Sequence, residues 1–161
     1  FSGSAQGFID DATRRGIAAI PFYRESIVLW AKTDAEIAQK GPVHMADLVN
    51  MPVLMTTGKM CNPLKTAIRD LFASRRIVPL FSYCEMDSFS DLQFSREKDC
   101  VCILPESAFT DPVLARRKDM VFVGLEDVGD EITTFLLYSE KNSKNSVKSF
   151  VEFCKQQTPY C

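Results

Sequence analysis

Residues 52–74 constrain the fold more than any other stretch, because they read as a strand, a polar turn and a helix in immediate succession. Residues 52–55 are apolar, and residues 56–61 are polar with one glycine. Asn62 and Pro63 are residue types favoured at the N-cap and at the first position of a helix. A strand that passes through a tight turn into a helix is the repeating element of an α/β sheet.

The helix expected after this turn is amphipathic. Lys65, Arg69 and Arg76 are expected to face water. Four hydrophobic residues recur at helical spacing and predict the face that packs on the sheet: Leu64, Ile68, Leu71 and Phe72.

The turn itself is the candidate ligand site. Ligands of open α/β sheets bind at the carboxyl ends of the strands, and a helix amino terminus favours an anion there. Thr56 and Thr57 offer hydroxyls beside Gly58 and Lys59, so we expect a small ligand that carries a carboxylate. Cys61, next to the helix amino terminus, is the one cysteine expected to favour its thiolate.

Further strands and helices alternate along the chain. Strands are expected over residues 27–30, 77–84, 100–104, 120–125 and 132–138, with Trp30 in the core. Helices are expected over residues 89–98, 105–109 and 146–157, the last with Val147, Phe150, Val151 and Cys154 toward a core. Residues 9–15 are expected to be a short helical or irregular piece. This alternation predicts a mainly parallel sheet.

Composition excludes several classes of function. A net charge of -2 and a pI near 5.5 give no basic surface for nucleic acid. No apolar run reaches the roughly 18 residues that a membrane helix needs, and no signal peptide is evident, so a cytoplasmic location is expected. The chain begins at Phe1 without a Met, which suggests a processed product or a fragment.

The residues that catalysis or metal binding would need are sparse. The six cysteines show no framework spacing and are expected to be free thiols, and Cys100 and Cys102 lack the histidines of a zinc site. His44 is the sole histidine and is expected to be a surface or capping residue. Glu85 and Asp87 fit an N-cap with a solvated acid better than an acid/base pair. No catalytic residue, metal or cofactor is therefore predicted.

The order of these motifs resembles the effector-binding domain of LysR-type transcriptional regulators over residues 16–157. The matching runs are IPFYRESIVLWAKTDAEIAQKGPVHMADLVNMPVLMTTG, CEMDSFSDL, CVCILPESAF and FVGLEDVGDEITTFLLYSEKNSKNSVKSFVEFCKQQ. The resemblance implies an α/β fold like that of type-II periplasmic binding proteins, with two lobes joined by crossover strands and a small effector between them.

The resemblance also implies a division of the chain. Residues 33–130 would form a complete lobe two, and residues 16–32 with 131–157 the remainder of lobe one with its crossovers. Residues 1–15 would be a loosely ordered N-terminal segment and 158–161 a tail. The DNA-binding head and the first strand–helix–strand of lobe one are expected to be missing.

The family's ligand contacts map onto four places in this sequence. The turn after the first lobe-two strand falls on Thr56, Thr57, Gly58 and Lys59, and Thr57 is the best-placed hydroxyl. The other three places are the loop ahead of the first crossover, the strand near the second crossover and the start of the returning strand: Tyr23, Arg24, Glu25; Val101, Cys102; and Thr133.

We therefore expect a non-enzymatic sensor whose effector biases lobe closure. That bias would pass through a homodimer or tetramer to a DNA-binding head outside this chain. Two alternatives stay open: a solute-binding protein that serves a transporter, and a thiol-based redox switch that uses Cys61.

Overall fold

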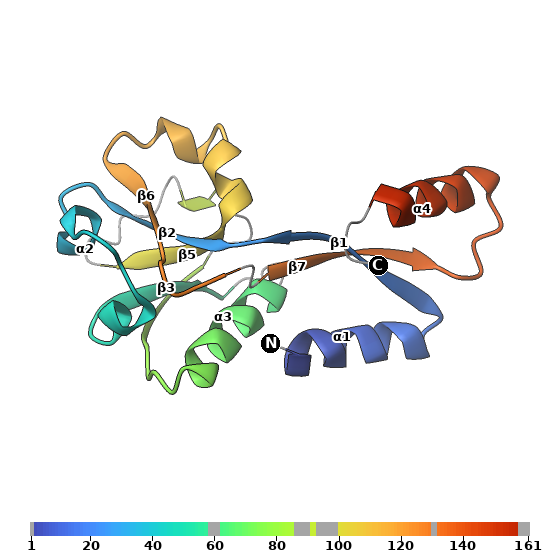
Figure 1. Cartoon of the computed structure of the whole chain (residues 1–161), viewed down its shortest axis with the longest axis horizontal. Helices are drawn as coiled ribbons and strands as arrows, with labels where there is room; N and C mark the ends of the chain where they lie inside the picture. The colour runs from blue at the N-terminus through green and yellow to red at the C-terminus, as the bar shows by residue number, and fades with distance from the viewer. Residues whose placement is uncertain (1, 58–61, 86–90, 93–99, 130–131, 158–161) are drawn as a thin grey trace. The chain divides into compact units, whose positions relative to one another are not determined.

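The computed structural model describes residues 2–57, 62–85, 91–92, 100–129 and 132–157, and its chain divides into two compact units (Figure 1). Unit 1 takes in Glu25–Glu131. Unit 2 combines Ser2–Arg24 with Ile132–Cys161. The chain therefore passes from one unit to the other between residues 24 and 25 and again between residues 131 and 132.

Unit 1 is built on a five-stranded sheet in the order β4-β3-β5-β2-β6. β3 pairs in parallel with both β4 and β5, whereas β2 pairs antiparallel with both β5 and β6. The strands are β2 (Ile27–Lys32), β3 (Pro52–Thr56), β4 (Leu80–Cys84), β5 (Val101–Pro105) and β6 (Met120–Gly124).

The prediction of a mainly parallel sheet is wrong, because the sheet is mixed. α3 (Asn62–Ser74) does connect the parallel strands β3 and β4, as the alternation indicates. β2, however, lies between β5 and β6 and runs against both. Hydrophobic periodicity shows that a segment is a strand but not which strands it pairs with or in which direction, so the reversal of β2 left no signal in the pattern.

Both faces of this sheet are covered. On one face α3 (Asn62–Ser74) packs with Ile68, Leu71 and Phe72 buried, and the Phe72 ring meets the Phe81 ring edge-on at 5.9 Å. On the other face a cluster forms around Val28, Trp30, Leu54, Cys102 and Leu104. Its cover includes Leu92, Ala108 of η3 (Glu106–Thr110) and Leu114 of η4 (Leu114–Arg116). Trp30 is a core residue, as expected.

The loops around β2 and β3 contain short helices. α2 (Glu36–Gln39) follows β2, and η1 (Met45–Leu48) precedes β3. Pro79 precedes the edge strand β4, where its missing N–H costs no sheet hydrogen bond. The helix predicted over residues 89–98 falls mostly outside the described residues. Among the described helices, none is long and apolar enough to cross a bilayer.

Unit 2 contains a two-stranded sheet, β1 (Ile17–Glu25) with β7 (Ile132–Ser139), and two helices, α1 (Ser2–Arg14) and α4 (Asn145–Gln157). The backbone N–H of Glu140 donates to the carbonyl of Gly16 at 3.1 Å, so the end of β7 lies beside the start of β1. Gly16 has a φ of 73°, which lets the chain turn directly from α1 into β1.

Two expectations for unit 2 differ from the structure. Residues 2–14 form a regular helix, where a loose opening followed by a short piece was expected, and Tyr23, Arg24 and Glu25 belong to β1 rather than to a loop. On α4, Val151 and Cys154 are buried as predicted, but Phe150 is 52% exposed. The 3.6-residue period put Phe150 at the margin of the apolar face, and the described part of unit 2 supplies little to cover that margin.

Arg76 provides a test of backbone strain at the end of α3. Its φ is 55°, and residues other than glycine adopt this left-handed conformation at a cost of about 1 kcal/mol. We expect Arg76→Gly to raise the free energy of unfolding by about 1 kcal/mol in urea titrations. Ala73→Gly, in the last turn of the same helix, should lower the free energy of unfolding by a similar amount. A destabilised Arg76→Gly variant would contradict the left-handed conformation of Arg76.

Arg117 and Asp119 provide a test of pH dependence. Two hydrogen bonds of 2.7 Å from the Arg117 guanidinium lower the pKa of Asp119 from 3.8 to about 2, with a smaller contribution from Lys32. Because the folded-state pKa is depressed, this pair stabilises the fold above pH 3.8, and the contribution is lost as the pH falls through about 2. An NMR titration of Asp119 should show this midpoint, and Arg117→Gln should return it to near 3.8.

Candidate functional site

The strand register of unit 1 places the ends of several strands at one border of the sheet. β3 and β4 end side by side, with Thr56 opposite Cys84, and β5 runs parallel to β3 and ends at Pro105. Because β2 is antiparallel to β5, its first residue, Ile27, lies opposite Pro105. We call this border, formed by Thr56, Cys84, Pro105 and Ile27, the C-terminal edge. Ligands of open α/β sheets bind at such an edge.

Thr56 and Thr57 bring polar groups to this edge from β3. Thr56 is 8% exposed, one of two buried polar or charged residues among those described. The backbone N–H of Thr57 donates to the carbonyl of Cys84 at 2.8 Å, so this amide is not free for a ligand. The Thr57 hydroxyl is exposed and donates to the same carbonyl at 3.3 Å. Since the amide already satisfies that carbonyl, the hydroxyl can turn to another acceptor at little cost.

Glu25 is the other buried polar residue, and it ties the start of β2 to the end of β5. Its carboxylate is 6% exposed and accepts a 2.7 Å hydrogen bond from the backbone N–H of Ser107. The neighbouring residues are bonded as well, because the backbone N–H of Glu106 donates to the carbonyl of Ser26 at 2.9 Å. These two bonds fix the turn into η3 against the point where the chain enters unit 1.

The C-terminal edge therefore presents hydroxyls and carboxylates to solvent. Thr57 and Ser107 are exposed hydroxyl residues, and Glu85 and Glu106 are exposed acids at the same border. Within the described part of the chain, no group of three or more His, Cys, Asp and Glu side chains is placed to hold a metal ion. The arrangement can donate and accept hydrogen bonds around a small polar ligand.

The structure brings together only part of the predicted site. Thr56, Thr57 and Glu25 share the C-terminal edge. Val101 and Cys102 lie at the beginning of β5, away from that edge, and are 1% and 5% exposed. Tyr23, Arg24 and Thr133 belong to unit 2, on β1 and β7, and Gly58, Lys59 and Cys61 lie outside the described residues. Ligand contact by the predicted binding residues and a redox role for Cys61 both stay predictions.

Four of the six cysteines are described, and none of these four forms a disulfide: Cys84, Cys100, Cys102 and Cys154. Cys84 and Cys100 pack against the core cluster that contains Cys102. Burial raises the pKa of the Cys102 thiol well above its usual value, and the neighbouring Cys100 and Cys84 raise it further. Cys102 therefore acts as a small apolar core residue and not as a reactive thiolate.

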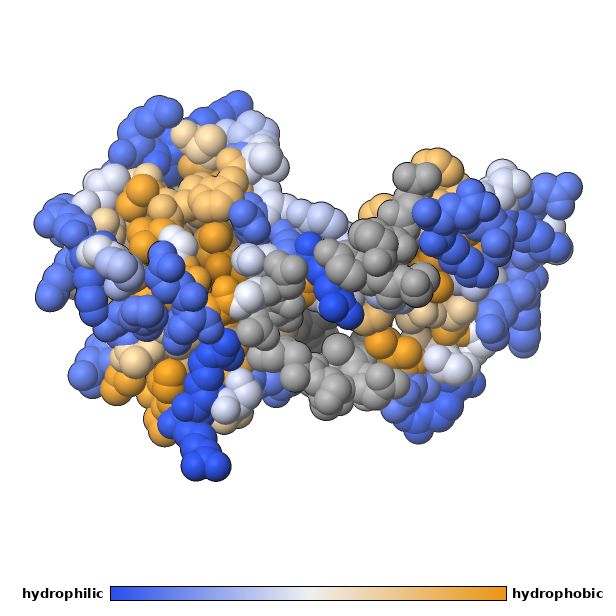
Figure 2. Space-filling model, viewed as in Figure 1, coloured by the Kyte–Doolittle hydropathy of each residue, from blue (hydrophilic) through white to orange (hydrophobic). Residues whose placement is uncertain are grey.

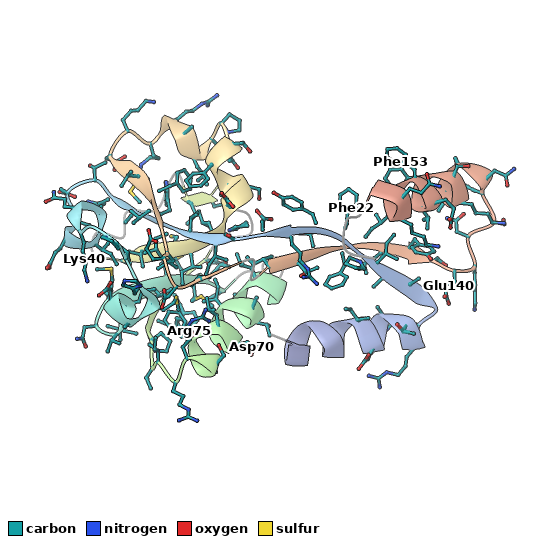
Figure 3. All side chains as sticks on the ribbon, in the orientation of Figure 1. Phe22, Lys40, Asp70, Arg75, Glu140 and Phe153 are labelled. Atoms are coloured by element: carbon teal, nitrogen blue, oxygen red, sulfur yellow. The ribbon has the colours of Figure 1, made fainter. Side chains whose placement is uncertain are left out.

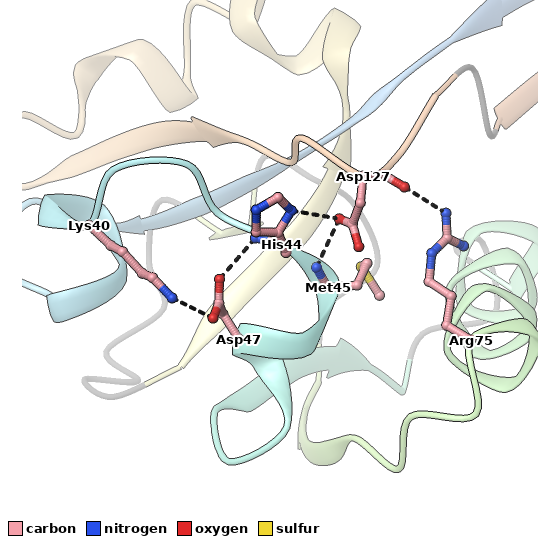
Figure 4. Close-up of polar contacts among 6 residues, drawn as sticks. All are labelled: Lys40, His44, Met45, Asp47, Arg75 and Asp127. Atoms are coloured by element: carbon pink, nitrogen blue, oxygen red, sulfur yellow. Dashed lines mark hydrogen bonds and ion pairs between the residues drawn. The ribbon is translucent and has the colours of Figure 1, made fainter.

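A second set of polar contacts joins three loops of unit 1 (Figure 4). After β6, the Asp127 carboxylate accepts a 2.9 Å bond from the N–H of Met45, and its Oδ1 lies 3.9 Å from Nδ1 of His44. Arg75, beyond the end of α3, donates to the Asp127 carbonyl at 3.1 Å. Asp47 pairs with Lys40, and this bond together with the N–H of His44 lowers the pKa of Asp47. The network positions loops and leaves His44 a structural role.

Sequence reasoning missed the partners of the site residues. Glu25 was expected at the site, but its bond to the backbone N–H of Ser107, 82 positions away, was not. The available signal was a proline, an acid and a serine directly after a buried strand, which marks a helical turn with N–H groups to satisfy. Nothing in the sequence indicated which carboxylate would satisfy them.

Comparison with solved structures identifies the class. The effector-binding domain of QuiR in complex with shikimate is 15% identical, with a TM-score of 0.67 over 95% of this chain and 76% of that chain. The effector-binding domain of BenM with its effector benzoate is 16% identical, with a TM-score of 0.68 over 97% and 75%. This likeness establishes a fold of the type-II periplasmic-binding-protein class, as predicted.

The sequence then identifies the family. The pattern of the LysR substrate binding domain matches residues 8–159, and the chain belongs to that family, whose members are regulatory effector-binding domains. No curated protein matches the sequence. CbnR, a LysR family transcriptional regulator, is 17% identical with a TM-score of 0.66 over 88% of this chain, and the match covers 48% of CbnR. This chain thus spans about half the length of that regulator.

Glu25 provides a test of how the C-terminal edge is held. Replacing its carboxylate in Glu25→Ala leaves the N–H of Ser107 without its acceptor, and we expect a loss of about 1–3 kcal/mol in the free energy of unfolding. Glu25→Gln keeps an acceptor oxygen and should lose less. Glu85→Ala, an exposed acid at the same edge, is the control and should change stability by less than about 0.5 kcal/mol. Equal effects of the three substitutions on urea unfolding would refute this role.

Proposed function

We propose that this chain is the effector-sensing domain of a LysR-type transcriptional regulator and that it binds a small, carboxylate-bearing molecule at the C-terminal edge of unit 1. The observation that carries the proposal is the convergence of three strand ends and one strand start at that edge, with an exposed Thr57 hydroxyl beside them. Membership of the family supports it independently.

The proposal that the ligand carries a carboxylate rests on the hydrogen-bond donors at the C-terminal edge. The Thr57 hydroxyl holds its present acceptor at 3.3 Å, a long bond that a charged acceptor would readily displace. The hydroxyl of Ser107 is exposed at the same edge. The ligands named for QuiR and BenM, shikimate and benzoate, are both small ring carboxylates, and this chemistry fits hydroxyl donors.

The remaining predicted contacts complete the proposal. Gly58 and Lys59 follow Thr57 in the sequence, and Lys59 would add a positive charge for the carboxylate. The other proposed contacts, made as the family resemblance implies, are Tyr23, Arg24, Glu25 and Thr133. The resemblance implies Val101 and Cys102 as well, but both are buried at the opposite end of β5, and this geometry does not support contact with a ligand at the C-terminal edge.

Signalling would follow from differential binding. An effector that binds the closed arrangement of the two lobes more tightly shifts the population toward it by the ratio of the two affinities. In a homodimer or tetramer, that shift would reach a DNA-binding head elsewhere in the full protein. The chain's match to about half of CbnR is consistent with a sensing domain that acts within a longer regulator.

A thermal-shift screen of benzoate, shikimate and related small carboxylates tests the proposed site. A true effector at about 100 times its Kd stabilises the native state by about 2.7 kcal/mol, which raises the Tm by several degrees. Thr57→Val removes the hydroxyl, and we expect it to weaken binding by about tenfold, or 1.4 kcal/mol.

Thr33→Val is the matched control. Thr33 lies just after β2, at the opposite border of the same sheet, and its N–H and hydroxyl both donate to the Asp119 carbonyl, at 3.0 and 3.3 Å. The two variants therefore lose the same kind of hydrogen bond. Only Thr57→Val should reduce the ligand-induced shift, and an equal shift in both variants would move the site away from the C-terminal edge.

A further inference from the structure

Glu25 is a buried carboxylate without a cation beside it. Its side chain is 6% exposed, and within the part of the chain that the structure describes its one hydrogen-bond donor is the backbone N–H of Ser107, 2.7 Å from Oε2. Burying a carboxylate is costly unless a positive group or several donors compensate for the lost water. One neutral amide compensates only in part. Glu25 therefore indicates a further partner that the described residues do not supply.

The second carboxylate oxygen of Glu25 is open to such a partner. Among the described residues, Oε1 accepts no hydrogen bond, whereas every fully buried side-chain oxygen or nitrogen has a partner. Oε1 is therefore not fully buried, and a small molecule can reach it. An ionised carboxylate has about four acceptor positions, of which the Ser107 amide uses one.

The rest of the C-terminal edge carries the same sign of charge. The segments that meet there, residues 25–27, 56–57, 84–85 and 105–107, contain three acids and no lysine, arginine or histidine. Besides Glu25 the acids are Glu85 and Glu106, and both are exposed. Like charges repel and opposite charges attract across such an edge. A ligand that carries a positive group in addition to its carboxylate therefore fits this edge better than a simple anion.

Two basic residues of unit 1 lie elsewhere and have partners of their own. Lys40, beside α2, pairs with Asp47, and Arg75, beyond the end of α3, donates to the Asp127 carbonyl (Figures 3 and 4). Neither forms an ion pair with Glu25. The positive partner of Glu25 is thus left to a bound molecule.

We propose that the effector is a zwitterion of the amino-acid type, whose ammonium group binds Glu25 while its carboxylate binds Thr57. This inference rests on the proposed function and narrows its ligand class. The ammonium donates to Oε1 of Glu25, and Oε2 keeps its bond to the Ser107 amide. Hydrogen bonds between charged groups are about twice as strong as neutral ones, so the ammonium contributes to selectivity as well as to affinity.

Matched pairs of probes test the proposal on the whole chain. One pair is 3-phenylpropionate and L-phenylalanine, and the other is 4-methylbenzoate and 4-(aminomethyl)benzoate. The members of a pair share a ring and a carboxylate and differ only in the ammonium group. Unit 1 also exposes hydrophobic surface (Figure 2), where a ring can bind by itself, and the comparison within a pair cancels such binding.

The ammonium-bearing member of each pair should bind the parent protein about tenfold more tightly in calorimetric titrations. Glu25→Gln keeps an acceptor for the Ser107 amide but loses the charge, so this preference should fall to about twofold or less. Glu36→Gln is the matched control, because it removes an exposed acid of α2, which follows the other end of β2, and it should keep the preference. Thr57→Val should weaken both members of a pair alike.

The outcomes separate this inference from the proposed function. Equal affinities within each pair, together with weaker binding by Thr57→Val, would overturn the zwitterion and keep the proposed site. An ammonium preference that Glu25→Gln retains would also overturn the inference. Binding by none of the four probes would overturn both. The comparison in the parent protein needs no variant, so it decides even if Glu25→Gln does not fold.

Discussion

The antiparallel pairing of β2 with β5 is the constraint on which the rest of unit 1 depends. β2 is covered on both faces and lies between β5 and β6, and its residues Leu29 and Ala31 are fully buried. The pairing also sets Ile27 opposite Pro105, so the entry of the chain into unit 1 meets the end of β5. Without that register, the Glu25 carboxylate would not lie beside the Ser107 amide at the C-terminal edge.

Two long-range hydrogen-bonded contacts then organise that edge. The Thr57 amide at the end of β3 donates to the Cys84 carbonyl, and the Ser107 amide donates to the Glu25 carboxylate just before β2. In each case a backbone group at a strand end is satisfied by a residue far away in sequence, which leaves a side-chain hydroxyl available beside a rigid support. A binding site on such supports is better defined than one on a free loop.

The sequence predicted local elements well and their pairing poorly. The strand at residues 52–55, the apolar face of α3 and the buried Trp30 follow from periodicity and capping chemistry, which act within one element. Three features depend instead on residues far away in the sequence. They are the direction of β2, the partner of Glu25 and the exposure of Phe150, which is set by the residues that pack on α4. The polar network of His44, Asp47 and Asp127 was likewise invisible, because each member alone reads as an ordinary surface residue.

The uneven distribution of burial between the units bears on how a sensor of this family would work. Unit 1 contains nearly all of the described buried core and bears the C-terminal edge, so the ligand contacts proposed there would rest on a rigid scaffold. Unit 2 has a two-stranded sheet and exposed aromatic rings, and segments with few buried contacts occupy the low-stability end of a protein's local unfolding equilibria. A ligand shifts an equilibrium only by its differential affinity for two states.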